Sequence, residues 1–122
     1  MAHNDKVRTV IFYREYYWEF YYRQTEKIRR KINKTLELVE QLPRIPENYF
    51  KHMEGSDGLY EIRVQHGSNA FRIFCCFDEG RLVVLLNGFQ KKSQKTPRQE
   101  IEKALQIKKE YENEKNEHHH IR

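Results

Sequence analysis

Apolar and polar residues alternate over much of the segment from residue 50 to residue 90, which is typical of β-strands. Turn residues interrupt this pattern at residues 66–69 and at Glu79-Gly80. We therefore expect strands over residues 59–65, 70–78 and 81–90, of which the last is the most apolar and hence central. β-branched and aromatic residues predict an earlier strand over Lys6–Tyr13.

A helical pattern follows this first strand. From Tyr17 to Val39, apolar residues recur at steps of three and four, which predicts one long helix or two short ones broken near Gln24-Thr25. Pro43 ends the pattern, because proline cannot continue a helix.

The last helix is expected to open at Thr96-Pro97, with Thr96 as N-cap and Gln99 completing a capping box. Residues 112–122 show no periodicity. The order of elements predicts a single compact α+β domain over residues 1–116, with a frayed tail over residues 117–122. Its antiparallel sheet would contain three strands besides the first one.

Composition narrows the function only slightly. The 122 residues include 23 Lys and Arg against 18 Asp and Glu, a formal charge of +5, which favours a polyanionic partner. No apolar stretch is long enough for a membrane span, and no secretory leader is recognisable, so we expect a cytoplasmic protein. Cys75 and Cys76 are adjacent and fit neither a disulfide nor a metal site, and we expect no metal and no cofactor.

The two hairpin turns predict which strand residues face each other. A loop at residues 66–69 pairs Gln65 with Ala70, and therefore Arg63 with Arg72. A two-residue loop at Glu79-Gly80 pairs three further couples, namely Asp78 with Arg81, Phe74 with Leu85, and Arg72 with Asn87. By alternation, one face of the sheet then collects five polar residues: Glu61, Arg63, Arg72, Asn87 and Lys91.

This face predicts an anion site. Two opposed arginines destabilise a sheet unless something compensates, and one glutamate is insufficient for so many cations. A phosphate group would suit the fork geometry of two arginines. Lys91, Lys92 and Lys95 add charge beside the amino end of the last helix. The alternative is a solvated basic face without a ligand.

Three stretches of the chain resemble a known family. They are "YFKHMEGSDGLYEIRV", "NAFRIFCCF" and "VVLLNGFQKKSQKTPRQEIEKA". In order and spacing, over roughly residues 7–110, the chain is similar to the RelE/ParE superfamily of bacterial toxins, in its HigB-like, phage-derived branch. The G-F-x-K-K-x-Q-K-T-P block is the most specific part. Asn87 stands where a histidine is common, and Ser93 where a threonine is common.

The resemblance implies the toxin of a toxin–antitoxin system, with a RelE-like fold. It implies a metal-independent messenger RNA endoribonuclease that acts in the ribosomal decoding site. An antitoxin, often of the helix-turn-helix type, would silence it, and we expect the toxin alone to be a monomer. The family's basic site falls on these positions: Lys51, Arg63, Arg72, Lys91, Lys92 and Lys95.

The residues leave the proton-transfer roles open. RNA cleavage needs a base for the 2′-hydroxyl, cations for the charge on phosphorus, and an acid for the leaving 5′-oxygen. Lys51, Lys91 or Lys92 could be the base, since clustered cations lower a lysine pKa. Glu61 could instead be the base or orient Arg63. Among further RNA contacts we include His52, which could be the acid, and the basic helix residues Arg29 and Arg30.

Residues 12–24 form the densest aromatic stretch. Helical spacing assigns four of its members to the core: Tyr13, Tyr17, Phe20 and Tyr21. Tyr16, Trp18 and Tyr22 lie off this stripe, so we expect the antitoxin to cover them. Stacking on RNA bases is the alternative.

Two other functions remain open from the sequence. A toxin of the same fold could poison gyrase without cutting nucleic acid, although the basic sheet face favours RNA cleavage. A non-catalytic RNA-binding module is the third candidate.

Overall fold

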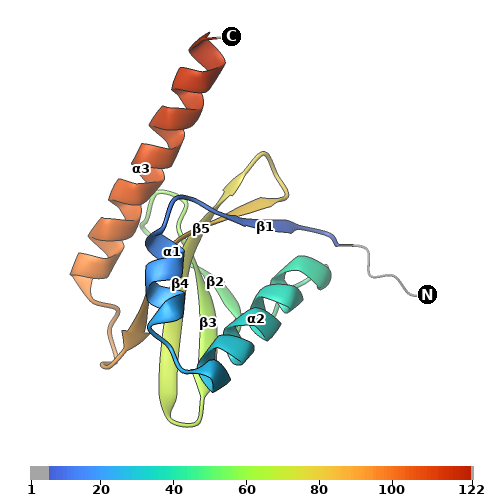
Figure 1. Cartoon of the computed structure of the whole chain (residues 1–122), viewed down its shortest axis with the longest axis vertical. Helices are drawn as coiled ribbons and strands as arrows, with labels where there is room; N and C mark the ends of the chain where they lie inside the picture. Colours follow the sequence, from blue (N-terminus) through green and yellow to red (C-terminus); the bar gives the residue numbers. More distant parts are fainter. Residues whose placement is uncertain (1–5, 122) are drawn as a thin grey trace.

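A mixed sheet of five strands separates two helical layers (Figure 1). The computed structural model describes residues 6–121, with side chains up to residue 117. The elements follow in this order: β1 (Thr9–Phe12), α1 (Tyr16–Tyr22), α2 (Glu26–Gln41), β2 (Phe50–His52), β3 (Tyr60–His66), β4 (Asn69–Asp78), β5 (Leu82–Lys91) and α3 (Arg98–Ile121). The expected α+β class is confirmed, and the arrangement is consistent with a RelE-like fold.

The strand order is β1-β5-β4-β3-β2, with β1 parallel to β5 and the other pairs antiparallel. β5 is therefore an interior strand between β1 and β4, whereas the middle of the sheet, where the sequence placed β5, is occupied by β4. The expectation of three strands besides the first was wrong by one, because β2 adds a fourth. β2 has only three residues, and two of them are the polar pair Lys51 and His52, so no alternation marks it in the sequence.

The register of the first hairpin agrees with the sequence. Gln65 pairs with Ala70 and Arg63 with Arg72, as predicted. The pairing continues to His66 and Asn69, which leaves a two-residue turn at Gly67-Ser68, where Gly67 has a φ of 61°. Apolar pairs alternate with polar ones along this hairpin, and a slip by one residue would turn the arginines toward the apolar core beneath α1 and α2.

The predicted register of the second hairpin was wrong. Asp78 pairs with Leu82, not Arg81, because Glu79, Gly80 and Arg81 form a three-residue loop in which Glu79 (φ 50°) and Gly80 (φ 78°) are left-handed. A β-bulge then shifts the register again between Ile73 and Cys75, where β5 has one residue more than β4.

As a result of both irregularities, Arg72 faces Phe89 and not Asn87. Leu85 faces Cys75 and not Phe74. The bulge does not change which residues share a face with Arg72, because Phe89 and Lys91 still lie on its side of the sheet.

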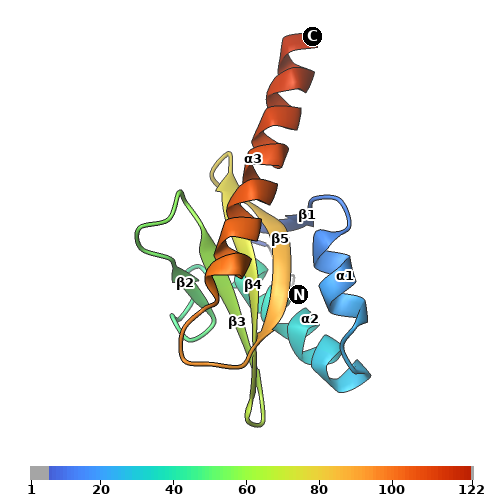
Figure 2. The same cartoon turned by 90° about the vertical axis from the view of Figure 1, so that its left-hand side faces the viewer.

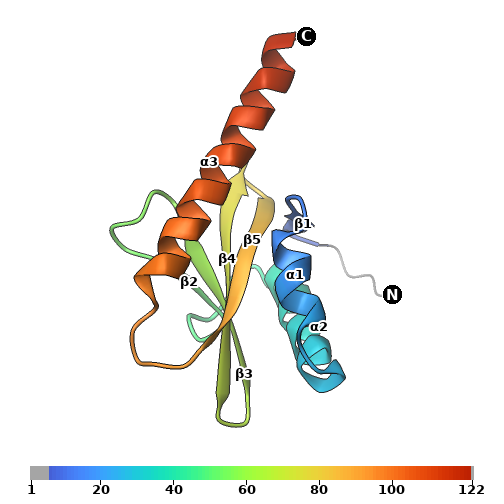
Figure 3. The same cartoon turned by 60° about the vertical axis from the view of Figure 1, so that its left-hand side comes forward.

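Each face of the sheet has its own apolar core, with α1 and α2 on one side and α3 on the other (Figure 3). Tyr17 and Phe20 are almost fully buried in the first core. Gly88 is required there, because a Cβ atom at this position would lie 2.6 Å from the Phe20 ring. Cys75 and Cys76 are buried free thiols whose pKa burial raises, so they serve as core residues.

The helical segment is broken, which is the second of the two alternatives that the sequence left open. α1 and α2 are separate, and Thr25 caps α2 by accepting a hydrogen bond from the Ile28 amide at 3.3 Å. α2 ends at Gln41, two residues before Pro43. None of the helices in the described part of the chain is long and apolar enough to cross a membrane.

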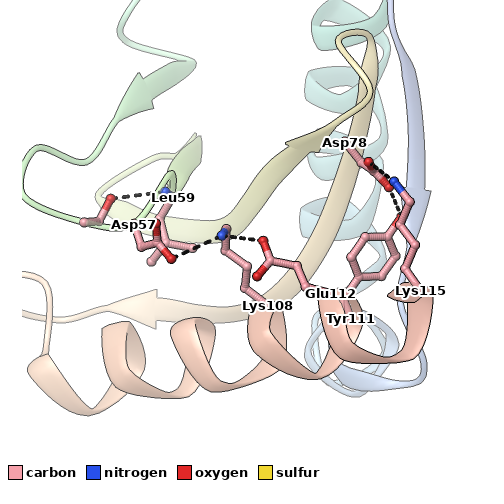
Figure 4. A network of polar contacts seen from close by, with 8 residues as sticks. Asp57, Leu59, Asp78, Lys108, Tyr111, Glu112 and Lys115 are labelled. Atoms are coloured by element: carbon pink, nitrogen blue, oxygen red, sulfur yellow. Dashed lines mark hydrogen bonds and ion pairs between the residues drawn. The ribbon is translucent and has the colours of Figure 1, made fainter. Parts of the chain in front are cut away.

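α3 runs past the upper end of the sheet (Figure 2), and polar contacts hold it in place (Figure 4). Lys108 forms ion pairs with Asp57 at 3.5 Å and with Glu112 at 2.7 Å. Tyr111 and Lys115 both bind Asp78. The helical backbone continues to Ile121, although its last residues show no apolar periodicity. The boundary between the domain (residues 1–116) and its tail (residues 117–122) stays a prediction.

Candidate functional site

Glu61, Arg63 and Arg72 form a charged cluster on the face of the sheet that α3 covers only in part. Glu61 Oε1 lies 3.6 Å from Arg63 Nε and 3.8 Å from Arg72 Nε. Neither Nε has a hydrogen-bond partner in the described part of the chain, because these ion pairs are too long for hydrogen bonds. The attraction is therefore one of charge. Arg63 Nη1 donates to the Glu47 carbonyl at 3.5 Å and Arg72 Nη1 to the Phe71 carbonyl at 3.1 Å, so the Nε atoms are the donors without a partner among the described residues.

Burial makes this cluster unusual. Glu61 exposes 5% of its surface and Arg72 exposes 8%. Burial lowers the pKa of Arg72 below its ordinary value, and the positive charge of Arg63 lowers it further, while Glu61 acts in the opposite direction. Arg72 stays charged, because the ordinary pKa of arginine is so high, but its charge is poorly compensated.

Two neighbouring side chains connect the cluster to the start of α3. The Thr96 hydroxyl donates a hydrogen bond to Glu61 Oε2 at 3.1 Å. Asn87 Nδ2 donates to the Glu100 carbonyl and to Glu100 Oε1, each at 3.2 Å, while its buried Oδ1 has no partner among the described residues. From the sequence, Thr96 was predicted only as the N-cap of the last helix, and its hydrogen bond to Glu61 was not foreseen.

Lys51 and Lys91 complete this face of the sheet. Lys51 on β2 pairs directly with Glu61, and Lys91 at the end of β5 lies beside Arg72. Burial lowers the pKa of Lys91, and the charge of Arg72 lowers it further. The predicted set of Lys51, Glu61, Arg63, Arg72 and Lys91 is thus brought together by the fold. Lys92 and Lys95 lie exposed in the segment between β5 and α3.

Three other predicted residues lie elsewhere. His52 pairs with Tyr60 and points to the opposite face by alternation, with its ring 5.0 Å from the Tyr60 ring. Arg29 and Arg30 belong to α2, across the sheet from α3 (Figure 3). Arg29 lies over the rings of Tyr21 and Tyr22, and Arg30 forms an ion pair with Glu26 at 3.7 Å.

Two cavities adjoin Arg72. The first, of about 510 Å³, is lined by Lys31, Thr35, Asn48, Tyr49, Arg63, Val64, Gln65 and Arg72. The second, of about 560 Å³, is lined by Ser68, Asn69, Ala70, Arg72, Gln90, Lys91, Lys92, Ser93 and Gln94. Neither lining contains an acidic residue, whereas two other cavities of the described chain contain Glu37 and Glu40, or Asp78 and Glu112.

This arrangement suits a phosphate group. The positive charges on this face outnumber the single carboxylate of the cluster, and the Nε atoms of Arg63 and Arg72 have no hydrogen-bond partner among the described residues, so an anion would supply the missing negative charge. In the described part of the chain, no group of three or more His, Cys, Asp or Glu side chains is placed to hold a metal ion. The side chains of the cluster can stabilise negative charge and transfer protons.

One comparison with known proteins gave a match. A sequence model for the family described as "Phage derived protein Gp49-like (DUF891)" matches residues 21–109, which include the whole cluster. The match begins inside α1 and ends inside α3, so it omits β1. No curated protein matches the chain.

The first prediction concerns the role of Glu61 in stability. Glu61→Gln removes the counter-charge of two arginines, so it should lower the free energy of unfolding by about 2–4 kcal/mol, somewhat less than for a fully buried pair because Arg63 is partly exposed. Urea denaturation measures this change. The matched control, Glu102→Gln, breaks an exposed pair with Arg98 and should cost about 0.5 kcal/mol or less.

The double variant Glu61→Gln, Arg72→Met should recover part of the loss, because it also removes the charge left without a partner. A Glu61→Gln protein as stable as its parent would show that Glu61 does not hold the arginines together.

Proposed function

The chain belongs to the Gp49-like family of phage-derived proteins, and we propose that it is the toxin of a toxin–antitoxin system and cleaves messenger RNA on the ribosome. The Gp49-like family is a RelE/HigB-like toxin family. Within this group we assign the chain to the HigB-like branch on the motifs of residues 87–101. The proposal of RNA cleavage is supported above all by Arg72. Its side chain is buried between Arg63 and Lys91, and its positive charge is only partly balanced by Glu61.

The proposed reaction breaks one bond and forms another at the same phosphorus. The 2′-oxygen gives its proton to the general base and attacks the adjacent phosphorus, the bond from phosphorus to the 5′-oxygen breaks, and the leaving 5′-oxygen takes up a proton from solvent water. The products are a 2′,3′-cyclic phosphate and a 5′-hydroxyl. Arg63 and Arg72 stabilise the extra negative charge on the phosphate oxygens in the transition state, where such donors are most effective.

Lys91 is our choice for the general base. Only its uncharged form accepts the 2′-hydroxyl proton, and burial together with Arg72 lowers its pKa in the direction this role requires. Glu61 is the alternative base, and in this scheme it positions both arginines. Lys51 and Lys92 flank the site and would hold neighbouring phosphates.

The other proposed RNA contacts lie further out. Lys95 is exposed in the segment that leads to α3, and His52 is on the far side of β2. Because Arg29 and Arg30 lie across the sheet, we assign them to ribosomal RNA and not to the cleaved message. Ribosome and message imply activity in the cytoplasm.

We place the antitoxin contact on the exposed aromatic residues near β1 and α1. Phe12 is 50% exposed and Tyr22 is 65% exposed. Trp18 lies between them, with its ring 5.1 Å from Phe12 and stacked on Tyr22 at 5.6 Å. Aromatic surface of this kind is enriched in protein interfaces. Tyr16 does not share this role, since its hydroxyl binds Glu110 on α3.

The test of the proposed function is in vitro translation with mapping of the message ends. The wild-type protein should stop translation and produce new ends within the translated region. A gyrase poison or a non-catalytic RNA-binding module would leave the message ends intact, and that result would contradict RNA cleavage.

Arg72→Ala should separate activity from stability. It removes a contact to the transition state, so single-turnover cleavage on programmed ribosomes should fall roughly a hundredfold or more. The thermal midpoint should match or slightly exceed that of the parent, because repulsion from Arg63 disappears. Lys109→Ala, which removes a charge from an exposed position on α3, should retain activity. Near-parental cleavage by Arg72→Ala would contradict its role.

The pH dependence of cleavage should identify the base. With Lys91 as base, the rate should rise with pH until the pKa of Lys91, which lies below the ordinary lysine value. Lys91→Arg should be slow and lose this rise, since arginine stays protonated, whereas Lys92→Arg should keep it. A wild-type rate that is flat above roughly pH 6 would instead indicate a carboxylate base.

The antitoxin contact has its own test. Trp18 is the only tryptophan of the chain, so its fluorescence should change when the antitoxin binds. Tyr22→Ala removes an exposed side chain and should weaken the complex without unfolding the toxin. An unchanged spectrum together with full affinity of Tyr22→Ala would place the interface elsewhere.

A further inference from the structure

The two cavities beside Arg72 differ in chemistry although they share this residue. The cavity on the β2 side is lined by Tyr49, by the side-chain amides Asn48 and Gln65, and by Lys31 and Thr35 of α2. The cavity on the β5 side is lined by Lys91 and Lys92 and by three side-chain amides, those of Asn69, Gln90 and Gln94, but by no aromatic residue. A phosphate at Arg72 would therefore have two unlike neighbourhoods, one on each side along an RNA strand.

The β2-side cavity has the composition of a nucleobase site. An aromatic ring stacks on any base, while amides read the hydrogen-bonding edge of a base. The β5-side cavity, which has two lysines and no ring to stack on a base, suits a ribose and its phosphate. The absence of acidic residues from both linings favours a polyanion over a protein segment rich in basic residues.

Hydrogen bonds within the chain position the residues that would contact the base. The Arg63 amide donates to the Tyr49 carbonyl at 2.8 Å, which places Tyr49 beside Arg63 and extends the pairing of β2 with β3. Gln65 Nε2 donates to the Gly67 carbonyl at 2.9 Å. With its nitrogen held in this way, the Gln65 amide offers its oxygen, which accepts hydrogen bonds.

We propose that the cavity lined by Tyr49, Asn48 and Gln65 binds the base next to the cleaved bond and determines which nucleotides are accepted there. This inference rests on the proposed ribonuclease function and deepens it. Tyr49 stacks on the base, and Gln65 Oε1 accepts a hydrogen bond from an exocyclic amino group. Adenine, cytosine and guanine carry such a group and uracil does not, so uracil is disfavoured at this position.

The experiment measures single-turnover cleavage on ribosomes programmed with messages that differ only in the two nucleotides flanking the cleaved bond. Tyr49→Ala should slow cleavage about tenfold or more, whereas Tyr49→Phe, which keeps the ring, should retain the rate. Gln65→Leu keeps the size of the side chain but removes the acceptor, so the discrimination against uracil should shrink several-fold. Gln41→Ala, at the exposed end of α2, is the matched control for loss of an amide and should change neither quantity.

The outcomes separate this inference from the function on which it rests. If the wild-type protein cuts none of the messages, the proposed ribonuclease function and this subsite both fail. If it cuts them, but Tyr49→Ala and Gln65→Leu keep both the rate and the base preference, only the subsite is overturned. Melting temperatures identify variants that do not fold. Gln65 is exposed, so Gln65→Leu decides the question even if Tyr49→Ala unfolds the protein.

Discussion

Two arginines face each other across β3 and β4, and the arrangement depends on the carboxylate of Glu61 between them. One oxygen of Glu61 attracts both guanidinium groups, while the other accepts the hydroxyl of Thr96. Glu61 therefore joins the middle of the sheet to the segment that leads into α3. Without it, two like charges would lie opposed on adjacent strands, which is unfavourable in any sheet.

The molecule uses its cations in two different ways. Along α3, Lys108 and Lys115 each form two ion pairs with carboxylates, so their charges are largely compensated within the fold (Figure 4). At the cluster, by contrast, Arg63 and Arg72 share one carboxylate at distances too long for hydrogen bonds. The proposed site rests on this difference, because the Nε donors of both arginines have no hydrogen-bond partner among the described residues.

Such a site lowers the stability of the folded protein when no anion is bound. Burial lowers the pKa of both Arg72 and Lys91, which means that the native fold disfavours the charges it holds there. A bound phosphate would reverse this situation by supplying the missing negative charge, and it would stabilise the folded chain. The same depressed lysine pKa provides a base for the reaction we propose. Stability and activity are therefore expected to move in opposite directions at these positions.

By itself the sequence determined the class of fold and the pairing of Arg63 with Arg72, whereas it left open whether the first helical segment is continuous or broken. The two predicted features follow from local signals, namely periodicity and a short turn flanked by apolar pairs. The three-residue loop at Glu79–Arg81 and the bulge in β5 were decided by backbone geometry that residue types do not specify. The contacts of Glu61 with Thr96 and of Arg63 with Tyr49 join segments distant in sequence, and only the packing of the tertiary structure brings such residues together.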